Sequence, residues 1–188
     1  REGDGFEIGM QEVTVHARRA ATFQEIAERD DLTGLSNLVG LRRILGRQLS
    51  QLRASSPLSC VYVDILAFGD INHVFGRDAG DAVLRAVGEH LRKQISPPAA
   101  VGRVRDDQFL LVLPGNELTL TRSQATLLLT MLSRTPVEYR GMSIPLRVSI
   151  GAVECVSGMN AEQLIESARL ACQLSRQEGA PHPYAVMA

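Results

Sequence analysis

The sequence predicts an α+β domain with a ferredoxin-like β-α-β-β-α-β core, in which a central, mainly antiparallel sheet is flanked by helices. Short apolar runs of strand type alternate with longer amphipathic segments in the order helix, β, α, β, β, α, β, β, α. The chain has 188 residues, of which 45% are hydrophobic and 22% charged. These values fit a single globular core at about 100 to 200 residues per domain.

The first 29 residues differ in character from the rest of the chain. Residues 6–15 are β-rich in places, and residues 17–29 are polar with apolar side chains at helical spacing. We interpret 1–29 as the tail of an upstream domain with a connecting helix, and 30–188 as the main domain. The alternative is a frayed N-terminus packed on the main domain. Because the first residue is Arg rather than Met, we expect a piece of a longer polypeptide.

The main domain is predicted to begin with a helix, a strand and a second helix. Leucines recur every three or four residues over Ser36–Ala54, which predicts an amphipathic helix. Leu58–Ile65 is an apolar run that predicts a largely buried strand with Asp64 near its end. The second helix is expected to begin near Asp78 and to end at Ile95.

Two hairpins are predicted further along the chain. The runs Ala99–Val104 and Phe109–Leu113 are of strand type and are joined by the polar residues 105–108, a connection of hairpin length. Val137–Arg140 and the alternating run Ile144–Ile150 predict a second hairpin.

Two further helices are expected to cover the sheet, one at Leu118–Arg134 and one at Ala161–Glu178. Tyr184–Met187 is expected to add an edge strand.

Charge and cysteine content exclude several classes of partner. The net charge of −1 gives no basic surface for nucleic acid or for an anionic membrane. The three cysteines are far apart and show no C-x-x-C spacing, so we expect buried reduced thiols rather than disulfides or zinc ligands. No run of about 18 apolar residues or signal peptide is found, which predicts a cytoplasmic protein without membrane insertion.

Two acids are candidates for chemistry. Asp64 lies near the end of the first core strand, and Asp107 lies in the turn between the next two strands, so the two carboxylates can converge. Paired acids beside a backbone carbonyl form a hard-oxygen site for Mg²⁺, which bridges phosphates in nucleotide chemistry. The alternative is that both are strand-end and turn acids, which are favoured there for local hydrogen bonding.

Four blocks resemble the GGDEF family, whose active members condense two GTP molecules into cyclic di-GMP. They are DLTGLSN at 31–37, VDILAFGDIN at 63–72, GRDAGD at 76–81 and RVRDDQF at 103–109. The last block falls where the family has R-Y-G-G-D-E-F. The resemblance extends over about residues 30–188 and implies the same α+β fold.

The signature segment departs from the family pattern. It consists of Arg105, Asp106, Asp107, Gln108 and Phe109. The family has glycines at the first two positions, where a residue without Cβ leaves room for nucleotide phosphates, and here Arg105 and Asp106 add bulk and a negative charge. The third position keeps an acid, but Gln108 is a neutral amide. The resemblance therefore assigns no catalytic residue and implies a degenerate signature.

Other positions that the resemblance places near the phosphates have also changed. The second acid of the 63–72 segment is Leu66, and the family's phosphate-contacting lysine is Gly69. The Lys and Arg near the end of the family domain correspond to Arg176 and Ala180. Each lost charge-assisted hydrogen bond weakens binding by roughly 1.5 to 3 kcal/mol, so nucleotide binding should suffer.

The guanine side of the family site is retained. The resemblance implies that Asn72 and Asp81 would read the base edge, and that Asp64, the Ile65 carbonyl and Asp107 could still hold one Mg²⁺. The alternative roles are structural, with Asn72 as a helix-end cap and Asp81 as a first-turn acid that suits the helix dipole.

Two further site types are not expected. The family's inhibitory R-x-x-D site has Ser96 and Ala99 at its charged positions, which implies that no product-binding site is present there. The four histidines, His16, His73, His90 and His182, are scattered and are expected at the surface.

The resemblance and the departures together predict a catalytically inactive GGDEF-like regulatory or scaffold domain of a multidomain bacterial cyclic di-GMP signalling protein, next to sensory and EAL domains. Its partners would be those neighbouring domains and partner signalling proteins. No cofactor is required, and Mg²⁺ enters only if GTP binding is retained. The alternatives are a GTP-binding allosteric module without turnover and an active diguanylate cyclase.

Overall fold

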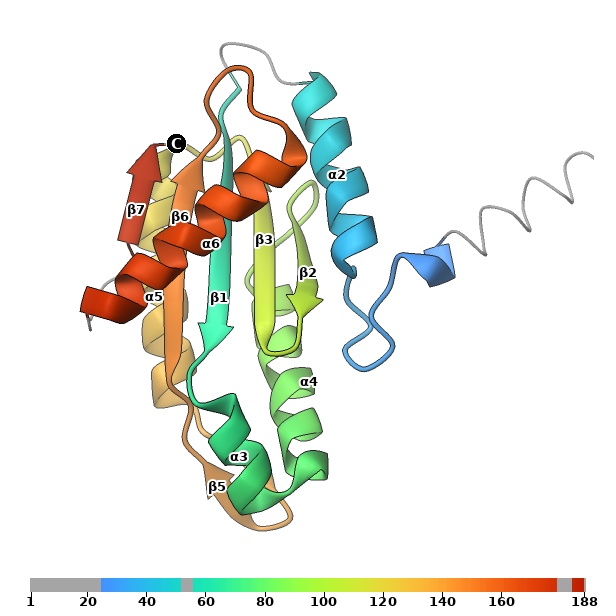
Figure 1. Cartoon of the computed structure of the whole chain (residues 1–188), viewed down its shortest axis with the longest axis vertical. Coiled ribbons are helices and arrows are strands. Elements are labelled where there is room, and N and C mark those ends of the chain that lie inside the picture. The colour runs from blue at the N-terminus through green and yellow to red at the C-terminus, as the bar shows by residue number, and fades with distance from the viewer. Residues whose placement is uncertain (1–24, 52–55, 179–183, 188) are drawn as a thin grey trace, which may run out of the picture.

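The computed structural model describes residues 25–51, 56–178 and 184–187 (Figure 1). The predicted β-rich segment at 6–15 and most of the predicted connecting helix lie outside these residues. The helices are α2 (Leu38–Gln51), α3 (Phe68–Phe75), α4 (Arg77–Lys93), α5 (Leu118–Arg134) and α6 (Ala161–Glu178). The strands are β1 (Leu58–Ile65), β2 (Ala100–Arg105), β3 (Gln108–Pro114), β4 (Val137–Tyr139), β5 (Met142–Ile144), β6 (Val148–Glu154) and β7 (Tyr184–Met187).

The central sheet has the strand order β2-β3-β1-β6-β7. β1 pairs antiparallel with both β3 and β6, β2 pairs antiparallel with β3, and β7 adds a parallel edge strand to β6. The predicted α+β architecture with a mainly antiparallel sheet is confirmed. β4 and β5 form a separate small hairpin.

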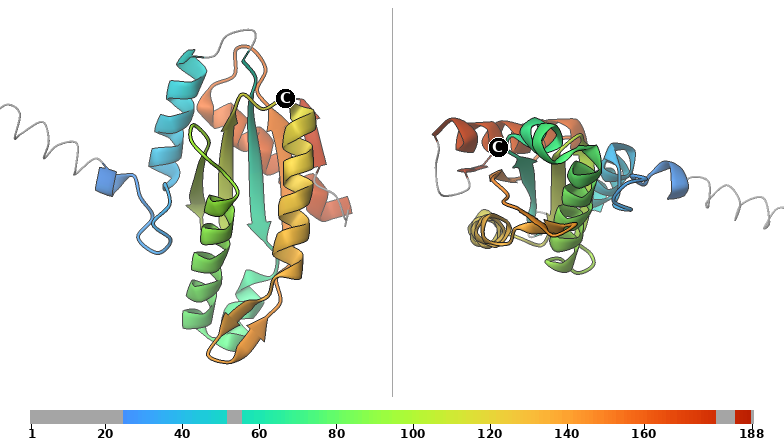
Figure 2. Two further views of the ribbon diagram at one scale, coloured as in Figure 1. Left: turned by 180° about the vertical axis from the view of Figure 1, so that it is seen from behind. Right: turned by 90° about the horizontal axis from the view of Figure 1, so that it is seen from below.

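Helices cover both faces of the sheet because the strand residues alternate between two cores (Figure 2). Val61 and Val63 of β1 belong to the core that α4 and α5 complete, whereas Cys60 and Tyr62 belong to the core that α2 and α6 complete. All eight residues of β1 are buried, as expected for a central strand with helices on both sides. The functional candidates therefore lie at the ends of the strands.

α3 was not predicted from the sequence. It runs from Phe68 to Phe75 between β1 and α4, and only Ile71 of its eight residues is buried. Phe68, Ile71 and Phe75 do recur at helical spacing and pack toward the core, but eight residues are too few for the period to be recognised over several turns. Its limits are set by backbone conformation, because Ala67 before it and Gly76 after it have φ of 57° and 86°.

The hairpin connection at 105–108 was predicted too long. Arg105 ends β2 and Gln108 begins β3, and the two residues pair with each other across a turn of Asp106 and Asp107. A bulge between Arg103 and Arg105 lets the strands continue into the turn.

The predicted strand Ile144–Ile150 is two strands. β5 ends at Ile144 and β6 begins at Val148, and residues 145–147 between them are irregular. Pro145 has no backbone N–H to donate, which explains why the ladder breaks there. The remaining predicted helices and strands are found, with α2 two residues shorter at its start than predicted and α4 two residues shorter at its end.

α6 lies directly on β6. A Cβ on Gly151 would stand 2.1 Å from the backbone nitrogen of Cys172, so the helix approaches the strand too closely for any other residue. The Ser149 hydroxyl donates to the Cys172 carbonyl at 2.8 Å and fixes the helix against the strand. This packing places the last turn of α6 beside the end of β1. Within the described residues, no helix is long and apolar enough to cross a membrane.

Candidate functional site

The predicted metal residues Asp64, Ile65 and Asp107 come together because β1 ends beside the turn between β2 and β3, as the ribbon in Figure 1 shows for these elements. The register pairs Asp64 of β1 with Gln108 of β3 on one side and with Ser149 of β6 on the other. The sequence prediction that Asp64 and Asp107 come together is met by this topology, because Asp107 is the residue before Gln108.

Gln108 binds Asp64 directly. The Gln108 amide Nε2 donates to Asp64 Oδ1 at 3.1 Å, and its Oε1 accepts from the Tyr62 hydroxyl at 2.7 Å and from Arg105 Nε at 3.0 Å. Both polar atoms of the amide are therefore engaged. A carboxylate at position 108 could accept from Tyr62 and Arg105 but could not donate to Asp64.

Arg176 supplies a positive charge to the same carboxylate. Its Nη1 lies 3.6 Å from Asp64 Oδ2, and the two side chains are 61% and 12% exposed. The largely buried Asp64 thus faces an amide N–H on one oxygen and a guanidinium on the other. These are the kinds of group that satisfy a buried carboxylate without a metal ion.

Asp107 is half-buried, and its carbonyl accepts from the backbone N–H of Ile65 at 3.2 Å. Burial raises the pKa of its carboxyl, and the neighbouring Asp64 carboxylate raises it further. Asp106 contributes in the same direction, while Arg176 opposes it. Burial is thus the main reason that the Asp107 carboxyl holds its proton more tightly, and the two neighbouring carboxylates add to it.

Arg103 of β2 holds the turn between β2 and β3 in place through hydrogen bonds. Its Nε and Nη2 donate to the Asp106 carbonyl at 2.8 and 2.6 Å, and its Nη1 donates to both carboxylate oxygens of Asp30 at 3.2 and 3.1 Å. Asp106 itself has φ of 40°, a left-handed conformation at a position where the family has glycine. The Arg103 clamp thus holds a left-handed conformation that most residues avoid but that Asp tolerates better than most.

Asp30 joins the clamp to the segment that precedes α2. Thr33 donates to Asp30 Oδ1 through its backbone N–H at 2.9 Å and its hydroxyl at 2.7 Å. Burial raises the pKa of Asp30, but the Thr33 hydrogen bonds and the Arg103 guanidinium outweigh burial and lower it overall.

The remaining signature residues have structural positions. Phe109 is fully buried and packs in the core under α4 and α5. Arg105 is exposed, and its Nε donates across the turn to the Gln108 side chain.

The predicted guanine residues lie on adjoining helices, Asn72 on α3 and Asp81 on α4. Asn72 packs so closely on Gly80 that a Cβ on the glycine would stand 1.9 Å from Asn72 Oδ1. Asp81 follows Gly80 in the second turn of α4. Neither the Asn72 amide nor the Asp81 carboxylate hydrogen-bonds or ion-pairs with another residue in the described part of the chain.

The two structural alternatives for these residues do not match their positions. Asn72 lies inside α3, and the residue that caps this helix is Gly76. The acid in the first turn of α4 is Asp78 rather than Asp81.

The substituted positions outside the signature carry no charge. Gly69 is exposed with open space around it, and Leu66 is a partly buried apolar residue. Ser96 is exposed and Ala99 partly buried at the start of β2, far along the sheet from the turn. Among the described residues, no group of three or more His, Cys, Asp and Glu could hold a metal ion.

The two histidines in the described part of the chain, His73 and His90, lie at the surface as predicted. His73 is exposed, and His90 is partly exposed with Nδ1 2.7 Å from the Ala86 carbonyl. His16 and His182 lie outside the described residues.

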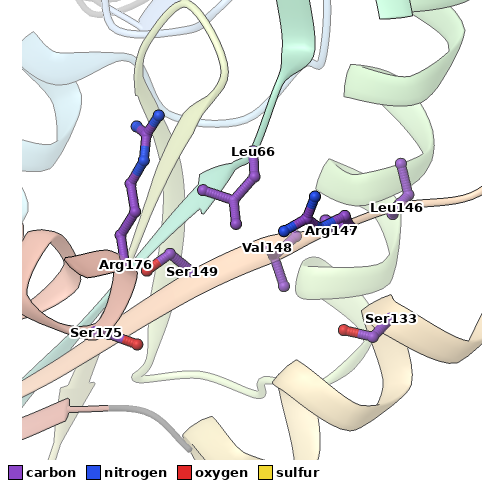
Figure 3. Close-up of a pocket in the computed structure, with 8 residues that line it drawn as sticks. All are labelled: Leu66, Ser133, Leu146, Arg147, Val148, Ser149, Ser175 and Arg176. Atoms are coloured by element: carbon purple, nitrogen blue, oxygen red, sulfur yellow. The ribbon is translucent and has the colours of Figure 1, made fainter. Parts of the chain in front are cut away.

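A pocket of about 350 Å³ lies beside this site, between the end of β1, the end of α5, the start of β6 and the end of α6 (Figure 3). Leu66, Ser133, Arg147, Ser149, Ser175 and Arg176 contribute to its lining. In Figure 3, Arg147 and Arg176 stand on either side of Leu66. The sequence pattern did not single out Arg147, because a lone arginine beside a strand carries no recognisable spacing.

Comparisons with known proteins agree on one family. The family model described as diguanylate cyclase, GGDEF domain, matches residues 27–182. An uncharacterized signaling protein of Caulobacter vibrioides is 29% identical over 188 residues, covering 94% of this chain and 23% of that protein. The diguanylate cyclase DosC of Escherichia coli is 28% identical over 163 residues, covering 84% of this chain and 35% of that protein.

A solved structure shares the fold. The coiled coil and GGDEF domain of DgcB from Caulobacter crescentus, in complex with c-di-GMP, matches with a TM-score of 0.83 at 21% identity and covers 95% of both chains. The present chain spans about a quarter to a third of the length of the two curated relatives.

Proposed function

This chain belongs to the GGDEF family of diguanylate cyclase domains, and from that premise we propose that it is a catalytically silent member that serves as a regulatory or scaffolding domain in a cyclic di-GMP signalling protein. The observation that carries the proposal is the hydrogen bond from the Gln108 amide to Asp64. It gives the acid at the end of β1 an internal partner where an active relative would need a metal ion.

The donor set argues against Mg²⁺. Magnesium prefers oxygen ligands in octahedral geometry. Asp64 is directed at two nitrogen donors, and releasing it would leave the Gln108 amide and the Arg176 guanidinium without their partner. We therefore derive no catalytic step through a metal ion for this chain.

The turn supports the same proposal. Asp106 places an exposed acid next to Asp107. A phosphate group that came within about 4 Å of a carboxylate would be repelled by about 4 kcal/mol at an effective dielectric constant of 20, so this turn disfavours a polyphosphate. Gly69 offers no cation to compensate.

The regulatory or scaffolding role is supported by the parts of the domain that are retained. The fold, both cores and the clamp from Asp30 to the turn are intact, so the domain keeps its shape while the chemistry is lost. The curated relatives are longer than this chain, which supports a place beside further domains such as sensory and EAL modules. Residues 1–29 would then be the upstream connection, in a cytoplasmic protein.

A second candidate is a GTP-responsive module without turnover. It is favoured by one observation. The side chains of Asn72 and Asp81 lie on adjoining helices, and neither makes a hydrogen bond or an ion pair with another described residue. An amide and a carboxylate can together read a guanine edge. Asn72→Ala and Asp81→Ala would abolish GTP binding in that case.

The test is an assay for cyclic di-GMP from GTP and Mg²⁺, using the whole chain and the same chain dimerised through a fused coiled coil. The dimerised chain is included because the cyclase reaction needs two domains that face each other, so a lack of product could otherwise be due to a monomeric chain. No product is expected from either. Product from the dimerised chain would overturn the proposal. A variant with Arg105→Gly, Asp106→Gly, Gln108→Glu and Gly69→Lys is the matched control and should bind GTP more tightly than the natural chain.

A further inference from the structure

We propose that residues 27–30 form a rigid joint that couples the connecting helix, of which the structure describes the last residues, 25–27, to the turn of Asp106 and Asp107. The joint is a regulatory device built into the fold, because a displacement of the helix would reach this turn without any ligand. It goes beyond the silent-domain role and does not depend on it.

Asn37 holds three consecutive carbonyls of this segment. Its side-chain Nδ2 donates to the carbonyls of Ala27 at 2.8 Å and Arg29 at 3.0 Å, and its backbone N–H donates to that of Glu28 at 2.8 Å. Carbonyls at the end of a helix have no partner within the helix, so these bonds satisfy them and fix the direction of the chain. The Asn37 Oδ1 also accepts from the Gly40 N–H at 3.0 Å and caps the start of α2.

A buried ion pair reinforces the contact with α2. Arg43 Nη2 lies 2.5 Å from Glu28 Oε2, and the Glu28 side chain is only 9% exposed. A Cβ on Gly40 would stand 2.5 Å from the Glu28 carbonyl oxygen, so the segment lies directly against the helix. Separating a buried ion pair leaves both charges without compensation, which makes a second position of the segment costly.

The same segment is tied to the turn between β2 and β3 (Figure 1). The Arg103 guanidinium donates to the Asp30 carboxylate and to the Asp106 carbonyl, and the Arg103 N–H donates to the Ser36 carbonyl at 2.8 Å. Only one residue separates Asp30 from Glu28, so the two attachments are adjacent in the chain. A movement of the connecting helix must therefore displace the turn or break these bonds.

Coupling between two ends of one network is reciprocal. A change at the Asn37 end should loosen the turn, and a change at the Arg103 end should loosen residues 27–30. If the contacts were only local packing, each change would stay at its own end.

The test is amide hydrogen exchange of the whole chain, measured by NMR spectroscopy. The Ile65 N–H donates to the Asp107 carbonyl at 3.2 Å and reports on the turn, whereas the Cys155 N–H donates to the Leu58 carbonyl at 2.8 Å and reports on the opposite end of β1. The readout is the ratio of the Ile65 exchange rate to the Cys155 exchange rate, because a uniform loss of stability accelerates both. We expect Asn37→Ala to raise this ratio about tenfold.

A second variant separates holding the segment from capping α2. Asn37→Asp keeps an oxygen for the Gly40 N–H but loses the Nδ2 donor to the two carbonyls, so it should raise the ratio as Asn37→Ala does. Asn160→Ala is the matched control. It removes a cap from α6, where Asn160 Oδ1 accepts from the Gln163 N–H at 3.0 Å, and should leave the ratio unchanged.

The reverse change completes the test. Arg103→Gln should accelerate exchange of the Arg29 N–H, which donates to the Ile26 carbonyl at 3.2 Å, relative to that of Cys155. The joint is overturned by an unchanged ratio in Asn37→Ala, by a ratio in Asn37→Asp equal to that of the natural chain, or by an Arg29 N–H that ignores Arg103→Gln. Cyclic di-GMP formation would contradict the silent-domain proposal alone, so the two failures are distinguishable.

Discussion

Gln108 has an amide NH2 where glutamate has a carboxylate oxygen, and this group decides how the Asp64 carboxylate is satisfied. Its N–H donates to Asp64, while its oxygen accepts from Tyr62 and Arg105. A glutamate would place a second carboxylate against Asp64 and would need a cation between them. The amide satisfies the same geometry with no ion.

We therefore predict that Gln108→Glu makes the domain responsive to magnesium. Because a ligand that binds only the folded state stabilises it by mass action, Mg²⁺ well above its dissociation constant should raise the free energy of unfolding of the variant by about 1 to 2 kcal/mol. The natural chain should not respond. Chemical denaturation with Mg²⁺ and with EDTA measures both, and Gln94→Glu at an exposed position far from the site is the control. A natural chain that responds as strongly as the variant would contradict the prediction.

Asp107 should reduce stability at neutral pH. A carboxyl whose pKa is raised in the folded state contributes stability below its unfolded pKa and loses it as pH rises through the folded pKa. Asp107→Asn should therefore be more stable than the natural chain at pH 7, and the gain should vanish as the solution is acidified toward the ordinary pKa of about 4.

Thermal denaturation across that pH range tests the prediction for Asp107. Asp31→Asn, an exposed acid, should show no comparable gain. An Asp107→Asn gain that is the same at every pH would show that charge is not its cause.

Part of this site was predictable from the sequence. The meeting of Asp64 with the turn at Asp107 follows from strand order, and strand order follows from the pattern of elements. The direction of the Gln108 amide does not, because it depends on Tyr62 reaching from a neighbouring strand. Asp106 lies in the turn as predicted, but Arg105, which was predicted in the connection, ends β2 and bonds across the turn to Gln108.

At the scale of elements, the Arg103 clamp joins the segment before α2 to the β2–β3 turn. Both sides of the ion pair are mostly buried, with side-chain exposures of 15% and 21%. Arg103→Ala should lower the free energy of unfolding by about 2 kcal/mol, because it leaves the Asp30 carboxylate and the Asp106 carbonyl without a donor.

Urea denaturation measures this loss. Arg92→Ala removes an exposed pair with Glu89 on one helix and should cost less than about 0.5 kcal/mol. Equal losses in the two variants would mean that the clamp contributes no more than a surface ion pair.

The contact between α6 and β6 depends on Gly151. A Cβ there meets the backbone of Cys172, which cannot turn aside as a side chain could. Gly151→Ala should destabilise the fold by about 3 kcal/mol or more. Gly46→Ala on α2, where a Cβ has open space, should instead stabilise it by about 1 kcal/mol. Thermal melting of both variants checks the prediction, which fails if Gly151→Ala melts with the natural chain.

Long elements with a clear period were predicted to within a few residues, among them β1, α5 and α6. The short helix α3 was missed because its eight residues make only about two turns, although Phe68, Ile71 and Phe75 lie at helical spacing. The break between β5 and β6 was missed because apolar alternation continues through Pro145.

For the molecule as a whole, the two cores and the sheet are independent of the site. The site lies at one end of the strands, so changes there alter chemistry without removing core residues. This separation explains how a GGDEF domain can lose turnover and keep its fold, and why the fold alone does not decide activity.

The most direct test is a titration of the whole chain with GTP, once with Mg²⁺ and once with EDTA. The account predicts that the heat of GTP binding, whether small or absent, is the same with Mg²⁺ and with EDTA. The reason is that the Gln108 amide and the Arg176 guanidinium already satisfy the Asp64 carboxylate. An affinity for GTP that rises about tenfold or more with Mg²⁺, which corresponds to about 1.4 kcal/mol, would contradict it.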